Sequence, residues 1–172
     1  MNIRSQGTSR PLVLIVAVAL IAAHGSVWAQ QGSTLDELSQ EYPGPDLAPK
    51  EVVRIQMEAF RRNDADDTGI AIAFRFASPQ NKEMTGPLSR FSRMMRGPLY
   101  RAMLRADAVE YGEPLVEDGM ARIEVTTVAP DGDRTYYAFY LSRQRGGEYE
   151  DAWMTEAVEV LPEGDQPPPG SV

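Results

Sequence analysis

Apolar residues recur at intervals of three and four up to about Arg105, and at intervals of two after it. The first spacing places side chains on one face of a helix, whereas the second is that of a strand with one buried face. Helices are predicted over residues 49–62, from Asp67 or Thr68 to 77, over 88–96, and from Pro98 to about 104. Prolines support these limits, because Pro49 suits the first turn of a helix whereas Ser78-Pro79 ends one.

The second part of the chain predicts strands at about 107–116, 121–127, 135–143 and 152–160. The turn Pro130-Asp131-Gly132-Asp133 joins the middle two into a hairpin. In the last strand Trp153 and Val158 have opposite parity, so its inward face stays open.

Helices followed by a run of strands predict an α+β fold, with the N-terminal helices packed on a curved four-stranded antiparallel sheet. We expect a single domain over residues 47–161, preceded by a flexible leader at 30–46. Residues 162–172 are rich in proline and lack large apolar side chains, which predicts a disordered tail.

Residues 1–29 have the features of a secretory signal peptide. Arg4 and Arg10 give a basic start, an apolar run follows from 11 to 23, and Val27-Trp28-Ala29 places small residues where a signal peptidase acts. The apolar run is shorter than the roughly 20 residues that span a bilayer. We therefore expect Sec-type export to the periplasm or beyond, with cleavage before Gln30 and no membrane association afterwards.

Composition excludes several chemistries. The 172-residue chain has no cysteine and one histidine, His24, which lies in the predicted signal peptide. Disulfides, thiolate nucleophiles and histidine-dependent triads are thereby excluded from the mature chain, and no cofactor or metal is expected. The net charge of −8 disfavours nucleic acid as a partner, because binding to phosphates requires a basic surface.

The segment from Asp64 to Gly69 begins like a calcium-binding loop. The twelfth position of that loop requires a bidentate glutamate, and this chain has Arg75 there. An acidic, capped helix start is the better interpretation, and no metal site is predicted.

Several residues recur in an order that resembles a known domain family: Gln56, Asn63-Asp64, Phe74, Ala77-Ser78-Pro79, Thr85-Gly86-Pro87, Phe91, Met94, Tyr100 and Trp153. The family is found in bacteria and plants and is catalogued as domain of unknown function 4864. It is similar in turn to the nuclear-transport-factor, ketosteroid-isomerase and cystatin-like folds, in which a bent sheet wraps a long helix. The resemblance implies a cone-like fold with a pocket at its open end, and it implies no activity. Thr155 and Glu156 depart from the common pattern in the last strand.

Two groups of candidate site residues follow. Phe74, Tyr100 and Trp153 are candidates to line a pocket, although packing in the core is the better explanation of the aromatic residues. Arg90, Arg93, Arg96 and Arg101, with Lys82 and Arg105, form a basic island that fits an anion-binding patch or a solvated helix face paired with the chain's own acids.

Three functions remain open. The first is a non-catalytic exported module that binds a small ligand or a protein. The second is an isomerase, dehydratase or hydrolase that depends on a carboxylate and a tyrosine, with Asp107 a conceivable base. The third is a homodimer assembled through the sheet, with either the Tyr136, Ala138, Tyr140 set or the Tyr137, Phe139, Leu141 set left uncovered.

Overall fold

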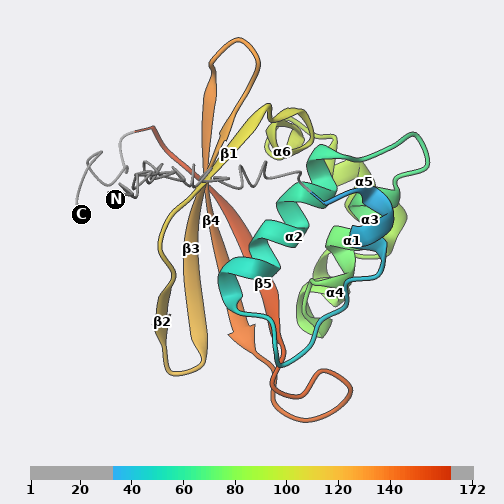
Figure 1. Ribbon diagram of the computed structural model, residues 1–172, viewed down its shortest axis with the longest axis vertical. Helices are drawn as coiled ribbons and strands as arrows, with labels where there is room; N and C mark the ends of the chain where they lie inside the picture. The colour runs from blue at the N-terminus through green and yellow to red at the C-terminus, as the bar shows by residue number, and fades with distance from the viewer. Residues whose placement is uncertain (1–32, 164–172) are drawn as a thin grey trace, which may run out of the picture. The chain divides into compact units, whose positions relative to one another are not determined.

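The computed structural model describes residues 33–163, in which helices come first and an antiparallel sheet follows (Figure 1). The helices are α1 (Leu35–Ser39), α2 (Pro49–Arg61), α3 (Thr68–Arg75), α4 (Pro79–Thr85), α5 (Leu88–Met95) and α6 (Arg101–Arg105). The strands are β1 (Ala108–Tyr111), β2 (Leu115–Glu117), β3 (Met120–Val128), β4 (Arg134–Arg143) and β5 (Trp153–Leu161). The α+β class predicted from the sequence is confirmed, whereas the predicted signal peptide and nearly all of the predicted tail lie outside the described residues.

The sheet has the order β1-β3-β4-β5, and β2 also pairs with β3. The strand predicted over 107–116 is thus two strands, which pair one after the other with opposite ends of β3. Pro114 stands between them and has no N–H to donate to the ladder, which explains the interruption. The sheet therefore contains five strands, although four lie across its width as predicted.

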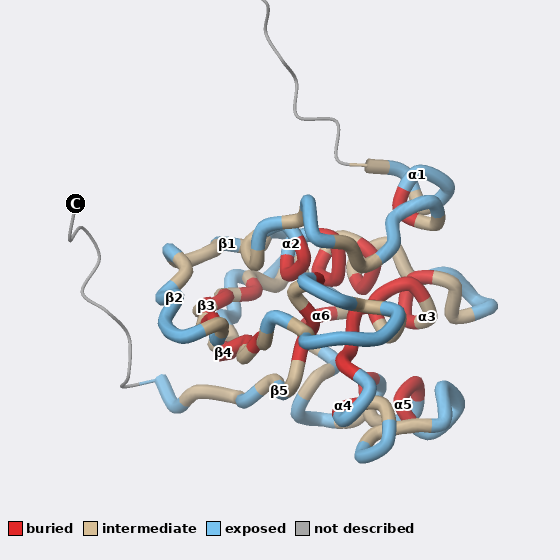
Figure 2. The backbone as a smooth tube through the Cα atoms, turned by 90° about the horizontal axis from the view of Figure 1, so that it is seen from below, coloured by how far each residue is buried: buried red, intermediate tan, exposed pale blue. Residues whose placement is uncertain are grey.

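The helices cover one face of the sheet, on the right in Figure 1. The covered face presents Ile123 of β3 together with Tyr137, Phe139 and Leu141 of β4, all fully buried. They belong to the same apolar cluster as the buried face of α2, and Figure 2 shows the buried positions gathered between helices and strands. Burial of these apolar side chains is the main stabilising contribution to the fold.

A β-bulge settles which face of β5 points inward. Leu141 pairs with Thr155 but Tyr140 pairs with Ala157, so Glu156 is an extra residue in the strand. The extra residue shifts the alternation by one. Trp153 and Val158 therefore point to the same, inner face despite their opposite parity, opposite Arg143 and Phe139 of β4.

The start of α3 differs in detail from the prediction that Asp67 or Thr68 caps it. The Asp64 carboxylate accepts a hydrogen bond from the Thr68 amide at 2.8 Å and so provides the cap. Asp67 has a left-handed backbone with φ 63°, and its carboxylate instead pairs with Arg96 of α5. Two acids of the calcium-like segment, Asp64 and Asp67, are thus bound to a helix terminus and to an arginine, respectively.

Two helices were not expected. In α4, Pro79 occupies the first turn and the Ser78 hydroxyl accepts from the Asn81 amide at 3.1 Å, so the residues predicted to end one helix also begin the next. In the segment expected to be a flexible leader, α1 begins with a capping box at Thr34 and buries Leu38. Of the two, α4 packs against β5, whereas α1 packs against α2 and α3.

Candidate functional site

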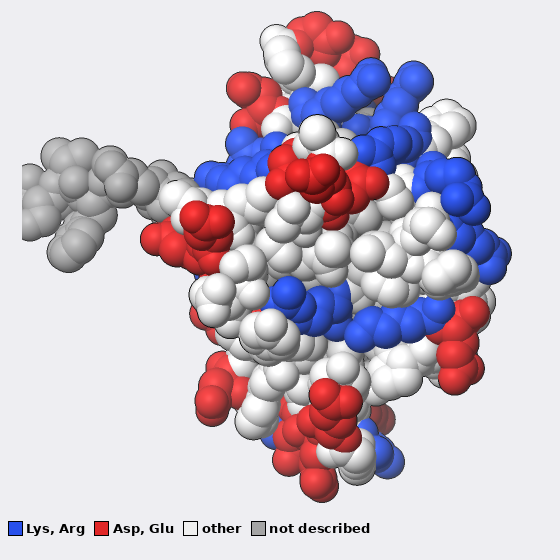
Figure 3. All heavy atoms as spheres, turned by 90° about the vertical axis from the view of Figure 1, so that its right-hand side faces the viewer, with Lys and Arg blue, Asp and Glu red and all other residues white. Residues whose placement is uncertain are grey.

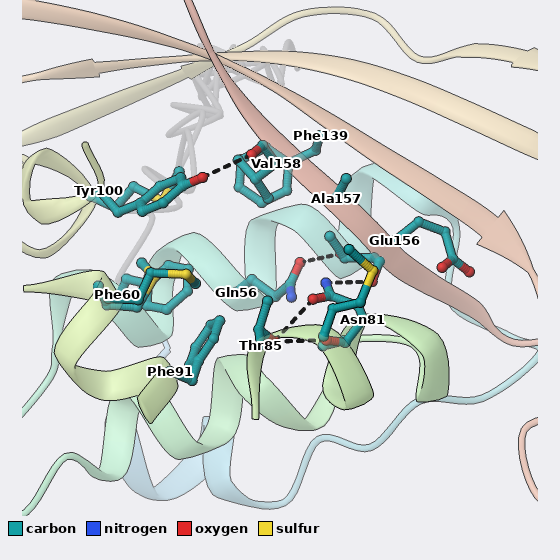
Figure 4. Close-up of a pocket in the computed structure, with 16 residues that line it drawn as sticks. Gln56, Phe60, Asn81, Thr85, Phe91, Tyr100, Phe139, Glu156, Ala157 and Val158 are labelled. Atoms are coloured by element: carbon teal, nitrogen blue, oxygen red, sulfur yellow. Dashed lines mark hydrogen bonds between the residues drawn. The ribbon is translucent and has the colours of Figure 1, made fainter. Parts of the chain in front are cut away.

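The candidate site is a cavity of about 160 Å³ between the helices and the edge strand β5. Its walls come from α2, α4, α5, α6 and β5, with one residue from β4 (Figure 4). The lining residues are Gln56, Phe60, Ala77, Asn81, Met84, Thr85, Phe91, Met94, Met95, Tyr100, Met103, Phe139, Thr155, Glu156, Ala157 and Val158. Aromatic and methionine side chains dominate this set.

The apolar wall combines rigid rings with flexible thioethers. The Phe60 and Phe91 rings lie with their centroids 6.5 Å apart, and Phe139 is fully buried behind the cavity. Met95 and Met103 are buried next to them. Methionine has three rotatable bonds and a polarisable sulfur, so a wall of this kind adapts to apolar ligands of different shape.

One end of the cavity is polar. The Thr155 hydroxyl donates to the Gln56 side-chain oxygen at 2.7 Å, and the Gln56 amide donates to the Ala73 carbonyl at 3.0 Å. The Asn81 amide donates to the Thr155 carbonyl at 3.0 Å, and the Thr85 hydroxyl donates to the Asn81 side-chain oxygen at 3.1 Å (Figure 4). These groups bind one another, so this end holds α2, α4 and β5 together.

The acid in the lining set, Glu156, points away from the cavity (Figure 4). Its carboxylate accepts from the Ser78 hydroxyl at 2.6 Å and from the Gln144 amide at 3.1 Å, and it also binds the Ser142 hydroxyl. Since Glu156 is the residue that the bulge inserts, the bulge directs this carboxylate outward.

Tyr100 is the predicted pocket residue that the structure places on the cavity wall, where its hydroxyl donates to the Val158 carbonyl at 3.2 Å. Phe74 lies behind the wall with its ring centroid 4.8 Å from that of Phe91, and Trp153 lies at the start of β5, outside the lining. Gln56 and Thr155 were not singled out as site residues. A polar residue at a core-facing position of an amphipathic pattern is the signal that could have found them.

The lining residues that are exposed or half-buried show where the cavity opens to the surface. Met84 of α4 is 66% exposed, Ala157 of β5 is also exposed, and Met94 and Tyr100 are half-buried. The mouth therefore lies where α4, α5 and the start of α6 face β5.

The basic island predicted from the sequence divides into paired and unpaired side chains. Arg96 binds Asp67, whose pKa is lowered by the hydrogen bonds from Arg96 and Ser92. Arg90, Arg93 and Arg101 are exposed and form no ion pair within residues 33–163. Figure 3 shows the helix side of the molecule, where both basic and acidic side chains border uncharged surface.

Lys82, the basic residue of α4, is half-buried. Its amine donates to the Arg75 carbonyl at 2.9 Å, and burial lowers its pKa. Asp107, the conceivable base, is exposed at the start of β1 and away from the cavity lining. Within residues 33–163 no group of acids could hold a metal ion, and none of the helices described there has the length and apolar character needed to cross a bilayer.

Fold and site together define an α+β domain whose helices and edge strand enclose a small apolar cavity. The chain belongs to the family described as Domain of unknown function (DUF4864), whose model matches residues 46–167. Comparison with curated proteins and with solved structures found no match. The similarity to the nuclear-transport-factor and ketosteroid-isomerase folds stays a prediction.

Proposed function

We propose that this protein is a non-catalytic module that binds a small apolar ligand in the cavity between α4, α5, α6 and β5. The observation that carries the proposal is the open, apolar wall formed by Phe60, Phe91, Met94, Tyr100 and Val158. Ligand pockets are concave and mostly apolar, with a few polar groups.

The size of the cavity limits the ligand. Its volume of about 160 Å³ is close to that of cavities of about 150 Å³ that take up benzene. A single aromatic ring or a chain of about six carbons is therefore the expected class of ligand.

The orientation of the polar groups argues against the enzymatic alternative. A carboxylate-dependent isomerase or dehydratase requires an acid within hydrogen-bond reach of its substrate. Glu156 directs its carboxylate to Ser78, Ser142 and Gln144, and the Tyr100 hydroxyl is bound to a backbone carbonyl. Binding without turnover is the function that this geometry supports best.

The test is a titration of the folded domain with 1-hexanol, followed by backbone amide NMR. The variant Val158→Phe places a larger side chain in the cavity, and Val160→Phe makes the same change on the same face of β5, outside the lining. We expect saturable binding to the wild type and to Val160→Phe. Val158→Phe should bind hexanol about tenfold more weakly. The larger ring should exclude roughly two CH₂ groups of the ligand from the cavity, at a cost of about 0.8 kcal/mol each. Equal binding to Val158→Phe, or no saturation with the wild type, would contradict the proposal.

A second candidate function, self-association, is favoured by an exposed apolar groove on the β2–β3 hairpin. Leu115 is 67% exposed, Val116 55% and Met120 48%, and Tyr140 also lines this groove. The Tyr137, Phe139, Leu141 set is in the core, which leaves only the face with Tyr140 for the sheet-mediated dimer. Light scattering after size exclusion should detect a dimer that Leu115→Asp dissociates, and a monomer at all concentrations would exclude this role.

We also propose that residues 1–29 direct export and are removed. The support is the basic start, the apolar run from 11 to 23 and the small residues before Gln30. Intact-mass measurement of exported material should give a chain that begins at Gln30. A full-length product retained in the cytoplasm would contradict this.

A further inference from the structure

One arginine of the basic island shares a helix face with the cavity wall. Met94 lines the cavity and is half-buried, and Arg90 precedes it by one helical turn on α5. Side chains four residues apart on a helix are neighbours on its surface. Arg90 therefore lies beside the mouth, exposed and without an ion pair among the described residues.

The other arginines lie on different faces. With 100° between successive residues, Arg93 is turned away from Phe91 and Met94. On α6, Arg101 lies on the side opposite Met103, the residue through which that helix lines the cavity. The patch expected from the sequence thus contributes a single side chain to the mouth.

Two acids in or next to the cavity lining in sequence, Glu83 and Glu156, form no ion pair with Arg90 in the described residues. With 100° between successive residues of α4, Glu83 lies on the face opposite Asn81 and Thr85, two residues that line the cavity. Glu156 is bound by Ser78, Ser142 and Gln144 on the far side of β5. Arg90 is therefore a charged side chain that helix geometry places beside the apolar mouth, on a chain with a net charge of −8.

We infer that the ligand is a small amphiphilic carboxylate, whose apolar end enters the cavity and whose carboxylate binds Arg90. This inference rests on the proposed function, because it assigns the charged end of the same ligand. The arginine fork donates two parallel hydrogen bonds to a carboxylate, a geometry that suits an exposed anchor at the mouth of an apolar cavity.

The experiment compares hexanoate with 1-hexanol, which have chains of the same length, at pH 7 and low ionic strength. Each is titrated by amide NMR into the wild type, Arg90→Gln and Arg93→Gln, two variants with the same change of charge on the same helix. We expect the wild type to bind hexanoate about three- to fivefold more tightly than hexanol, because an exposed ion pair contributes up to about 1 kcal/mol. Arg90→Gln should lose this preference, Arg93→Gln should keep it, and added salt should reduce it.

The outcomes separate this inference from the proposed function. Equal affinity of the wild type for hexanol and hexanoate would overturn the assignment of a carboxylate and leave the apolar cavity intact. Loss of the preference in Arg93→Gln as well as in Arg90→Gln would also overturn it, since the effect would then arise from the general field of the helix. Failure of both probes to bind would overturn both proposals.

Discussion

The hydrogen bond between Thr155 and Gln56 at the polar end of the cavity gives the sharpest test of the packing. The two side chains lie 2.7 Å apart, and the residues are only 2% and 4% exposed. Thr155→Val keeps the branched shape and all backbone hydrogen bonds of β5, but it leaves the Gln56 oxygen buried without its partner.

The expected cost follows from two opposing contributions. An unsatisfied buried acceptor costs about 1–3 kcal/mol. The extra methyl group of valine returns at most about 0.8 kcal/mol of apolar burial. The free energy of unfolding should therefore fall by about 0.2–2.2 kcal/mol, the difference between these contributions.

Urea denaturation followed by far-ultraviolet circular dichroism measures this difference. The control is Thr126→Val, on the uncovered face of β3, where the hydroxyl binds no group within residues 33–163. It should change stability by less than about 0.5 kcal/mol. Adding Gln56→Leu to Thr155→Val should recover part of the loss, because both buried polar groups are then removed. A Thr155→Val protein as stable as the wild type would refute this account of the polar end.

Three further substitutions test the fold and its electrostatics. Gly69→Ala should lower the free energy of unfolding by about 1–3 kcal/mol or more, because a methyl group there overlaps the Ala59 carbonyl at the contact of α2 and α3. Asp67→Asn should reduce the loss of stability on acidification: Arg96 lowers the folded-state pKa of Asp67, so its contribution is present above an unfolded pKa of about 4 and is lost as the pH falls below it. Tyr111→Phe should leave stability unchanged or raised, because the Tyr111 hydroxyl is buried with no hydrogen-bond partner in the described chain and its burial raises the pKa to about 12.

Each has a matched comparison by urea denaturation. Gly44→Ala should be neutral, because a methyl group there meets nothing closer than 4.0 Å, and equal effects at both glycines would contradict the close approach at Gly69. Parallel pH profiles for the wild type and Asp67→Asn would show that the pair with Arg96 contributes nothing. Tyr137→Phe should cost about 0.5–1.5 kcal/mol through its lost bond to Leu99, unlike Tyr111→Phe, and the reverse order would contradict the assignment.

The elements with strong local signals could be predicted from the sequence. Pro49 and the apolar stripe after it gave α2 to within one residue, and the turn at 130–133 gave the β3–β4 hairpin. Tertiary pairing decided what the local pattern left open. The inward face of β5 depends on a bulge at Glu156, which exists only when the strand pairs with β4.

The candidate site was predictable only in part, for a related reason. Tyr100 could be expected at a pocket because aromatic residues fill the interior of the cone-like fold that the resemblance implies, where a tyrosine hydroxyl suits the mouth. Gln56 and Thr155 are 99 positions apart, and only the docking of α2 on β5 brings them together. The division of the basic island likewise depends on which face of α5 and α6 packs inward.

The most direct measurement of the central claim is methyl NMR of the protein labelled at the methionine methyl groups, titrated with 1-hexanol. Four of the eight methionines, Met84, Met94, Met95 and Met103, line the cavity, whereas Met57, Met120 and Met154 lie elsewhere in the described residues. Binding in the cavity should shift the signals of the first group, with one shared dissociation constant, and leave the second group unchanged. Shifts confined to Met120, on the exposed hairpin groove, or equal shifts throughout, would contradict the account.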